Sequence, residues 1–228
     1  MFYYDSTMLI VLPALILTAY AQFKVNNAFS KYSRIYSSTS FTGETIARAI
    51  LAQAGITDVR IELFSGSDYG DHFDPTSKVI RLSNAVFNSS SVSALGIAAH
   101  ECGHAIQNKV GYVPNKIRAT LVPLANIGSK ASIPLLLIGL ALAIQPLQML
   151  GILFFSLSTM FYLVTLPVEF NASHRAVKIL RDYMPEAEIS NVKEVLSAAA
   201  LTYLAAALTS ILQLVRLISL SRRDDRRR

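Results

Sequence analysis

Long runs of uncharged, mostly hydrophobic residues alternate with polar regions along this chain. The first run, Ser6 to Phe23, has 18 residues without a charge, and the second, Ala131 to Val168, has 38. About 20 apolar residues in a helix cross the hydrocarbon core of a bilayer. The first run therefore predicts a membrane anchor. The second predicts a helical hairpin that turns at Gln145–Gln148 and whose first helix begins before Lys130.

A third apolar run, Val195–Val215, has 21 residues and is rich in alanine. It is long enough to cross a bilayer, but it could equally lie at the membrane surface or pack against the other helices. The run therefore predicts a helix whose placement, spanning or peripheral, stays open.

The polar region between the first run and the hairpin has the pattern of a small α+β unit. Apolar residues recur at helical spacing after a capping residue, Thr42, and the run stops at Gly55. Two segments then alternate as strands do, and two segments between them are rich in turn-forming residues. The strands are expected at Val59–Leu63 and Lys78–Leu82, and the turns at Ser65–Gly70 and Asp74–Ser77.

A second helix is predicted to start near Ser89–Ser91, where serines can cap it, and to end near Lys109. Its apolar stripe predicts the residues that face the core: Leu95, Ala98, Ala99, Cys102 and Ile106. His100, Glu101 and His104 lie on another face of this helix. The helix can therefore present these three polar side chains to a cleft.

Together these patterns predict an α+β membrane protein, mostly helical, with three or four transmembrane helices and a small β-sheet beside the second helix. We expect a single membrane-embedded domain over residues 1–228. Its expected parts are an anchor at 6–23, a cytoplasmic region at 24–118, a membrane hairpin at 119–168, a helical segment at 169–194, an apolar helix at 195–221 and a basic tail at 222–228.

Composition supports a membrane location. Hydrophobic residues make up 52% of the chain and charged residues only 16%, whereas soluble domains carry about 25% charged residues. The net charge of +6 comes from basic residues that flank the apolar runs. No basic stripe with interleaved aromatic residues is present, so we expect the lipid bilayer as a partner and no nucleic acid. The single cysteine, Cys102, excludes a disulfide within the chain.

Basic residues also predict the orientation in the membrane, because cytoplasmic loops carry an excess of Lys and Arg. Three groups of basic residues flank the apolar runs, while the turn of the hairpin is uncharged. Lys24, Lys31 and Arg34 follow the anchor, Lys109, Lys116 and Arg118 precede the hairpin, and Arg175, Lys178 and Arg181 follow it. We therefore expect a multi-pass protein of the cell membrane with the region 24–118 in the cytoplasm. The first run, which lacks a small-residue cleavage site, predicts an anchor that is not removed. If Val195–Val215 spans the membrane, the Arg-rich tail lies outside, against the rule that basic residues are cytoplasmic.

The sequence His100-Glu101-Cys102-Gly103-His104 carries the chemistry. It reads H-E-x-x-H, which places two imidazoles on one face of a helix where they can bind one zinc ion. The carboxylate of Glu101 lies beside them and can take a proton from a zinc-bound water. This pattern arises by chance in about two chains per thousand of this composition. It therefore predicts a catalytic metal site.

Catalytic zinc generally has three protein ligands, so a third ligand is expected elsewhere in the chain. The candidates are His72, Asp71, Asp74, Glu169 and His174. Glu169 is the best of them, because it follows 38 uncharged residues, where a carboxylate without a cation is poorly solvated. His174 is second. Asp71–Pro75 is expected to form a structural turn, with the alternative that His72 contacts the substrate or stabilises an oxyanion.

Three motifs in order along the chain carry a resemblance to a known family. They are Asp71–Pro75 with Lys78–Ser83, Ala98–Ala105 and Val168–Ser173. Together they resemble the YugP-type membrane zinc metallopeptidases, which are gluzincin-like and more distantly similar to HtpX-like proteases. The resemblance implies one zinc ion per chain bound by His100, His104 and Glu169, with Glu101 as general base. Where HtpX-like proteases have an acid four residues after the glutamate, this chain has Ser173, a candidate hydrogen-bond partner for a zinc-binding histidine.

The sequence thus predicts a zinc-dependent membrane endopeptidase that hydrolyses peptide or protein substrates. One alternative is a catalytically inactive membrane scaffold that keeps a zinc site, although structural zinc favours four ligands, often sulfur. A site-2-type intramembrane protease is a further alternative, but its motif lies within a spanning helix. A channel or transporter subunit is disfavoured because few polar residues occur in the apolar runs.

Overall fold

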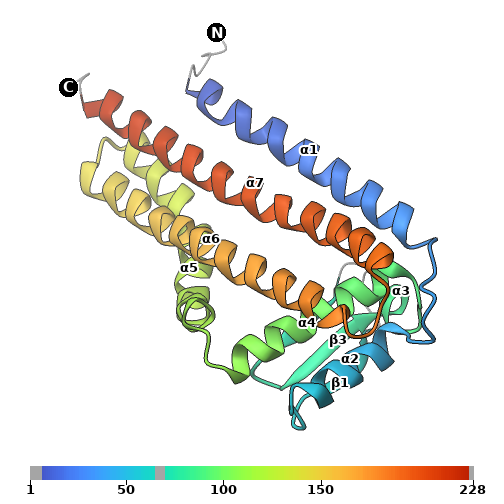
Figure 1. Ribbon diagram of the computed structural model, residues 1–228. Helices are drawn as coiled ribbons and strands as arrows, with labels where there is room; N and C mark the ends of the chain where they lie inside the picture. The colour runs from blue at the N-terminus through green and yellow to red at the C-terminus, as the bar shows by residue number, and fades with distance from the viewer. Residues whose placement is uncertain (1–6, 65–69, 226–228) are drawn as a thin grey trace. The chain divides into compact units, whose positions relative to one another are not determined.

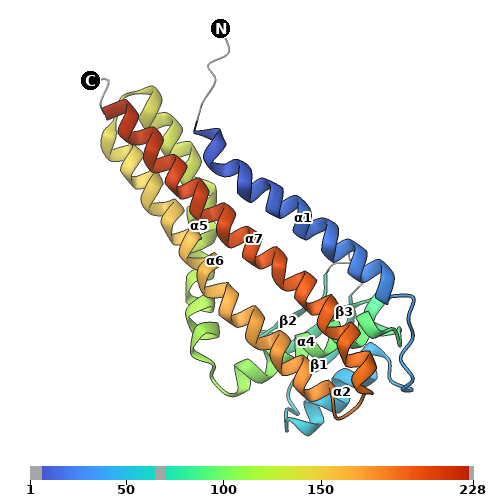
Figure 2. The same ribbon diagram turned by 45° about the horizontal axis from the view of Figure 1, so that its top comes forward.

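The computed structural model describes residues 7–64 and 70–225, and the side chains up to residue 222. In chain order the elements are α1 (Met8–Tyr32), α2 (Gly43–Gln53), β1 (Arg60–Phe64), β2 (His72–Asp74), β3 (Val79–Ser83), α3 (Asn84–Phe87), α4 (Val92–Lys109), α5 (Val113–Ala141), α6 (Gln145–Leu180) and α7 (Glu186–Asp225). Figures 1 and 2 show the long helices and the short sheet. The α+β class and the small sheet expected from the sequence are confirmed.

Backbone contacts divide the chain into two compact units. Unit 1 consists of residues 1–21, 116–166 and 202–228, and unit 2 consists of residues 22–115 and 167–201. Unit 1 is made of parts of the four long helices. Unit 2 contains the sheet, the short helices and α4, together with the remaining parts of α1, α5, α6 and α7.

The sheet of unit 2 has the strand order β1-β3-β2. β1 pairs with β3 in parallel and β2 pairs with β3 antiparallel, so β2 is an edge strand. Both expected strands exist, each beginning one residue later than predicted. The expected turn at Asp71–Pro75 was wrong, because His72–Asp74 is a strand. A strand of three residues is too short to produce a recognisable alternation.

The turn after β2 forms where Asp74 accepts hydrogen bonds from the backbone N–H groups of Thr76 and Ser77. This Asp-centred turn agrees with the turn expected at Asp74–Ser77. The other expected turn, Ser65–Gly70, lies mostly outside the described residues.

The hydrophobic core of unit 2 is formed by α2, α3, α4 and the sheet together with parts of α6 and α7. Thr42 caps α2 through a capping box, and Ser91 accepts a hydrogen bond from the Ala94 N–H at the start of α4. The predicted buried stripe of α4 is confirmed, since Leu95, Ala98, Ala99, Cys102 and Ile106 are all buried. Burial raises the pKa of the Cys102 thiol, and a thiol that stays protonated is unreactive.

In unit 1 the connection between α5 and α6 differs from the prediction. The turn lies at residues 142–144, where Ala143 has a φ of 58°, and α6 already begins at Gln145. The expected turn at Gln145–Gln148 was therefore wrong. Pro146 reads as a turn residue in the sequence, but proline also fits the first turn of a helix, where its missing N–H has no partner to lose.

Small residues allow the helices of unit 1 to pack closely. A Cβ on Gly151 of α6 would lie 2.7 Å from the Ser132 carbonyl oxygen of α5, and a Cβ on Gly128 would clash with the Phe154 carbonyl. Such close backbone approach at glycine is typical of helices that associate within a membrane.

Hydroxyl groups add hydrogen bonds between the same helices. The Ser158 hydroxyl donates to the Ala125 carbonyl oxygen over 3.2 Å, and the hydroxyls of Thr159 and Ser210 lie 2.8 Å apart. Polar side chains that find partners across helices in this way avoid an unsatisfied group in hydrocarbon.

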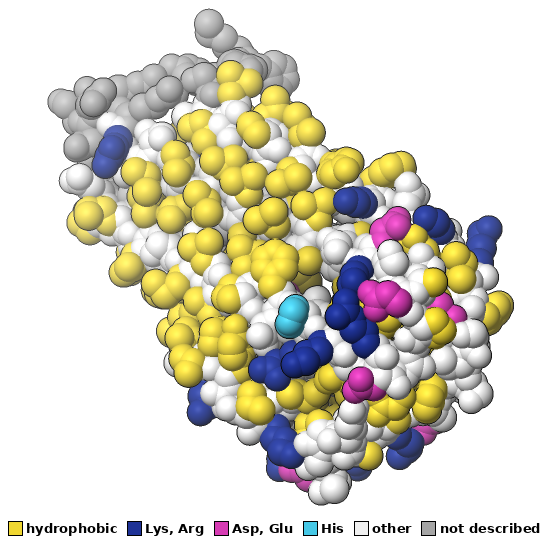
Figure 3. All heavy atoms as spheres, in the orientation of Figure 1, with side chains coloured by type: hydrophobic (Ala, Val, Ile, Leu, Met, Phe, Trp, Pro, Cys, Tyr) yellow, Lys and Arg dark blue, Asp and Glu magenta, His cyan; other side chains and the backbone are white. Residues whose placement is uncertain are grey.

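Within the described part of the chain, four helices are long and apolar enough to cross a membrane: α1, α5, α6 and the Glu186–Arg222 part of α7. Val195–Val215 is thus an internal part of one long helix. Figure 3 shows hydrophobic side chains covering the visible face of the long helices almost without interruption, whereas charged side chains gather over the elements of unit 2. Lys130 lies within α5 and is exposed, consistent with a first hairpin helix that begins before it.

Two contacts within unit 1 relate the ends of its helices. The Ser221 hydroxyl of α7 donates to Gln148 near the start of α6 over 2.8 Å, and Arg216 donates to Thr7, just before α1, over 3.2 Å. The beginning of α1, the turn after α5 and the end of α7 therefore share one end of this unit.

Candidate metal centre

Two histidines and a glutamate come together in unit 2 from two helices. His100 and His104 lie one turn apart on α4, and Glu169 lies on α6. The Nε2 atoms of the two histidines are 3.2 Å apart. Glu169 Oε2 lies 3.2 Å from His100 Nε2 and 3.5 Å from His104 Nε2. The three atoms thus form a nearly equilateral triangle.

The size of this triangle fits a metal ion. Zinc binds histidine nitrogen and carboxylate oxygen at about 2.0–2.1 Å, so two ligands at a tetrahedral angle lie about 3.3 Å apart. The three observed separations of 3.2, 3.2 and 3.5 Å match that spacing. The side chain of Glu169 is only 3% exposed, and a buried carboxylate needs a compensating cation. The donor set of two imidazoles and one carboxylate is the set found in catalytic zinc sites.

Close contact between α4 and α6 sets the spacing of the triangle. A Cβ on Gly103 would lie 2.7 Å from the carbonyl oxygen of Ala172 and 3.1 Å from its Cα. Only glycine lets the two backbones approach so closely. Gly103 directly precedes His104, and Ala172 lies three residues after Glu169, so this contact holds together the helical turns that carry the candidate ligands.

Each histidine has a hydrogen-bond partner for its other ring nitrogen. Ser173 Oγ lies 3.1 Å from His100 Nδ1, which is the type of contact expected for Ser173 from the sequence. Gln107 Oε1 lies 3.0 Å from His104 Nδ1. Gln107 was not predicted from the sequence, although a glutamine three residues after the second histidine, on the same helix face, could have indicated this contact.

Glu101 is held by the sheet. Its Oε2 accepts a hydrogen bond of 2.9 Å from the backbone N–H of Phe73 in the edge strand β2, and the residue is 7% exposed. A backbone donor fixes the carboxylate position without contributing charge. The strand that sequence patterns did not reveal therefore orients the carboxylate of the H-E-x-x-H motif.

The other candidate ligands have different partners. Among the described residues the group that could hold a metal contains only His100, His104 and Glu169. His72 is exposed, and its ring nitrogens contact the Gly70 carbonyl and, at 3.4 Å, Arg81. His174 is exposed on α6, as expected for an interfacial residue.

Asp71 and Asp74 hold the sheet and its turn. Asp71 accepts hydrogen bonds from the N–H and the hydroxyl of Ser83, and burial raises its pKa to about 6. Hydrogen bonds from Ser77 and Thr76 lower the pKa of Asp74 to about 2. Both acids thus have local structural partners.

Comparison with known proteins relates this geometry to a family. Residues 7–222 match the model of a family described as "Putative neutral zinc metallopeptidase". The chain belongs to this family. It is 43% identical over 220 residues to the "Putative membrane protease YugP" of Bacillus subtilis (strain 168). The aligned region covers 95% of this chain and 97% of that protein. No solved structure matches the chain significantly.

Membership in this metallopeptidase family confirms the resemblance seen in the sequence motifs. With its four apolar helices the chain is a multi-pass membrane protein of the family. The family implies zinc, and the triangle on α4 and α6 is a group of residues that could bind it.

Proposed function

We propose that this protein is a zinc-dependent membrane endopeptidase whose single zinc ion is bound by His100, His104 and Glu169, with Glu101 as general base. The observation that carries the proposal is the triangle of two imidazole nitrogens and one carboxylate oxygen with edges of 3.2–3.5 Å. Three ligands leave a position open for water, which distinguishes a catalytic zinc site from a structural one with four protein ligands. This feature favours an enzyme over an inactive scaffold.

A bound zinc ion would supply Lewis acidity, lowering the pKa of a water molecule to about 7 and polarising the substrate carbonyl. Glu101, held by the Phe73 N–H, accepts the proton of that water. Glu101 then returns the proton to the nitrogen of the departing amine, so that one carboxylate acts first as base and then as acid. Ser173 contacts His100 and Gln107 contacts His104, and these contacts keep the Nε2 atoms of both histidines directed to the proposed zinc position.

The test is Glu101→Gln, which preserves the shape of the side chain and its acceptor oxygen for the Phe73 N–H but cannot take a proton. We expect the purified variant to bind one zinc per chain and to lose cleavage of a general probe such as casein by at least about 100-fold, the scale of general base catalysis. Chelation should abolish the wild-type activity, and added zinc should restore it. Retained cleavage by the zinc-loaded variant would contradict the role of Glu101.

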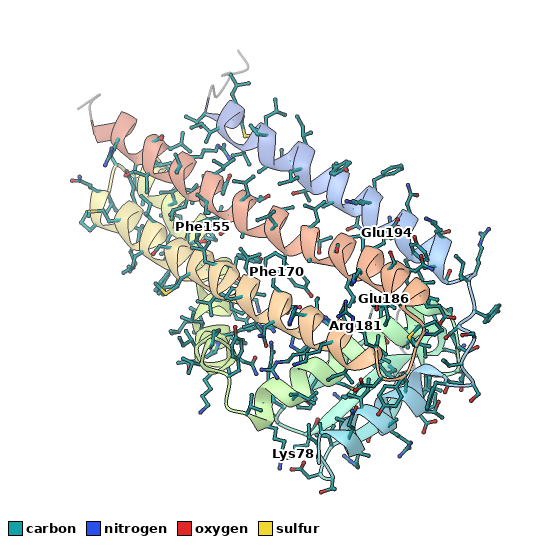
Figure 4. The ribbon with its side chains drawn as sticks, viewed as in Figure 1. Lys78, Phe155, Phe170, Arg181, Glu186 and Glu194 are labelled. Carbon is teal, nitrogen blue, oxygen red and sulfur yellow. The ribbon has the colours of Figure 1, made fainter. Side chains whose placement is uncertain are left out.

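We further propose that the site lies at the cytoplasmic surface of the cell membrane. The exposed residues along α6 change from apolar to polar near Glu169. Leu163 and Phe170 are apolar and 44% and 48% exposed, while His174 and Lys178 are the next exposed residues one and two turns on. Phe170, labelled in Figure 4, directly follows the proposed ligand. This change indicates that α6 leaves the hydrocarbon region close to Glu169.

Orientation can be tested by cysteine labelling, since the one native cysteine, Cys102, is fully buried and should not react. We expect a membrane-impermeant maleimide to label Leu142→Cys, at the turn after α5, in intact cells. Thr57→Cys, an exposed position in unit 2, should react only after permeabilisation. Because Ser221 near the end of α7 contacts the start of α6, this orientation also puts that part of α7 on the outer side. The reverse labelling pattern would overturn the orientation.

A further inference from the structure

A chain of hydrogen bonds leads from His104 through two amide side chains. Gln107 Oε1 lies 3.0 Å from His104 Nδ1, and Gln107 Nε2 donates to the Val168 carbonyl oxygen over 2.7 Å. The same nitrogen donates to Asn171 Oδ1 over 3.1 Å, and Asn171 Oδ1 also accepts from Arg175 Nε over 2.8 Å. Gln107 is fully buried. Both polar atoms of its side chain have partners in this series of hydrogen bonds.

The groups at the two ends of this series, the Val168 carbonyl and Arg175, fix the direction of each hydrogen bond. A backbone carbonyl such as that of Val168 only accepts, so the nitrogen of Gln107 must face it. An arginine only donates, so the oxygen of Asn171 must face Arg175 and is free to accept from Gln107. Both ends require the same orientation of the Gln107 amide, with its oxygen toward His104. His104 must then carry its proton on Nδ1.

A proton on Nδ1 leaves the lone pair of His104 on Nε2, the atom that belongs to the metal-binding triangle. We propose that Gln107 is the positioning residue that holds His104 in this tautomer and aims its Nε2 lone pair at the metal. The inference rests on the proposed metal site but not on peptidase activity.

Gln107 also connects the two ligand helices. The carbonyl that it binds belongs to Val168, the residue directly before Glu169. One buried amide thus ties a histidine ligand on α4 to the backbone beside the carboxylate ligand on α6. A rotation of α6 that displaced Glu169 would also break the bond that fixes the tautomer of His104.

Nitrogen-15 NMR of histidine side chains in the wild-type protein tests the proposal directly. After zinc is removed by a chelator, at pH 9 where imidazoles are ordinarily neutral, we expect His104 to be in the Nδ1–H form. The signal is assigned by its loss in His104→Gln. A His104 in the Nε2–H form, or an even mixture of the two forms, would overturn the proposal. This measurement involves no activity and no variant at Gln107.

The second measurement is zinc affinity by competition with a chromophoric chelator. Gln107→Leu keeps the volume of the side chain but removes its acceptor and donors. We expect its zinc dissociation constant to rise 10- to 100-fold, the usual effect of losing an outer partner of a zinc histidine, and the His104 spectrum to shift to a mixture of tautomers. Asn108→Leu, at the neighbouring exposed position, is the control and should leave both readouts unchanged.

A folded Gln107→Leu protein with wild-type zinc affinity and an unchanged His104 spectrum would refute the role of Gln107. If this variant does not fold, the wild-type spectrum still decides. Failure of the proposed function would look different: Gln107 could hold His104 as described in a protein that binds zinc but cleaves no peptide.

Discussion

Replacing Gly103 by alanine should separate zinc binding from folding. The new Cβ would lie 2.7 Å from the Ala172 carbonyl oxygen, whereas ordinary contacts of this kind begin at 3.4 Å. Neither atom belongs to a flexible side chain, so α4 and α6 must move apart by about 0.7 Å to restore that contact. Metal–ligand distances tolerate deviations of only about 0.2 Å. The displacement therefore exceeds what the triangle of ligands can absorb.

The effect on overall stability should be smaller. Overpacking of this kind costs about 1–3 kcal/mol, while alanine in place of glycine within a helix gains about 1 kcal/mol. The two effects largely offset each other, and the metal-free protein should remain folded. Zinc affinity has no such compensation, and we expect it to fall by more than about tenfold, at least the loss seen when an outer partner of a zinc ligand is removed.

The control is Gly96→Ala on the same helix. Its Cβ would meet the Val192 Cγ1 methyl group at 3.2 Å, a contact that needs a shift of about 0.2 Å by a side chain rather than a backbone. We expect it to bind zinc as the wild type does. Chelator competition gives the dissociation constants, and circular dichroism of the metal-free proteins follows unfolding. If Gly103→Ala binds zinc within twofold of the wild type, the close approach of α4 and α6 does not set the ligand spacing.

Two further predictions concern pH and the membrane hairpin. Burial raises the pKa of Asp71 from its unfolded value near 3.8 to about 6, so the folded state binds this proton more tightly, and the associated stability is lost as pH rises through that range. Asp71→Asn should remove up to about 3 kcal/mol of this dependence. The thermal midpoint of the variant minus that of the wild type should be larger at pH 8 than at pH 5. An equal difference at both pH values would contradict the raised pKa of Asp71. Gly151→Leu should force α5 and α6 apart at a cost of about 1–3 kcal/mol of stability, and so lower the thermal midpoint in detergent. Leu150→Ala, at a position 39% exposed, should lower the midpoint less; equal losses would argue against the close packing.

The larger elements could be predicted because their signals are strong. Uncharged runs mark the parts of α1, α5, α6 and α7 that can span a bilayer. Helical periodicity between capping residues predicted α2 and α4. The signal for the two candidate ligands on α4 is equally local, since H-E-x-x-H places both histidines on one face of the helix, one turn apart. Glu169 could be suggested because an acid that follows a long uncharged run needs a cation.

The parts that were missed depend on contacts between distant segments. β2 has three residues, and its pairing with β3 makes it a strand that no local pattern reveals. Pro146 fits both a turn and the first turn of a helix, so the sequence did not decide between them. The importance of Gln107 arises from the Val168 carbonyl, 61 positions later in the chain. The spacing of three residues from His104 could indicate the contact with that histidine, but no local pattern reveals the second partner, a backbone carbonyl on another helix.

The order of these elements along the chain has a consequence for biosynthesis. The proposed metal-binding triangle joins His100 to Glu169, which is 69 positions later. At about 5–20 residues per second the ribosome needs roughly 3–14 seconds to make that interval. All of α5 and most of α6 are synthesised within it, so a nascent chain that already displays H-E-x-x-H still lacks its third donor. The proposed hydrolytic centre can therefore be completed only after the membrane hairpin has been made.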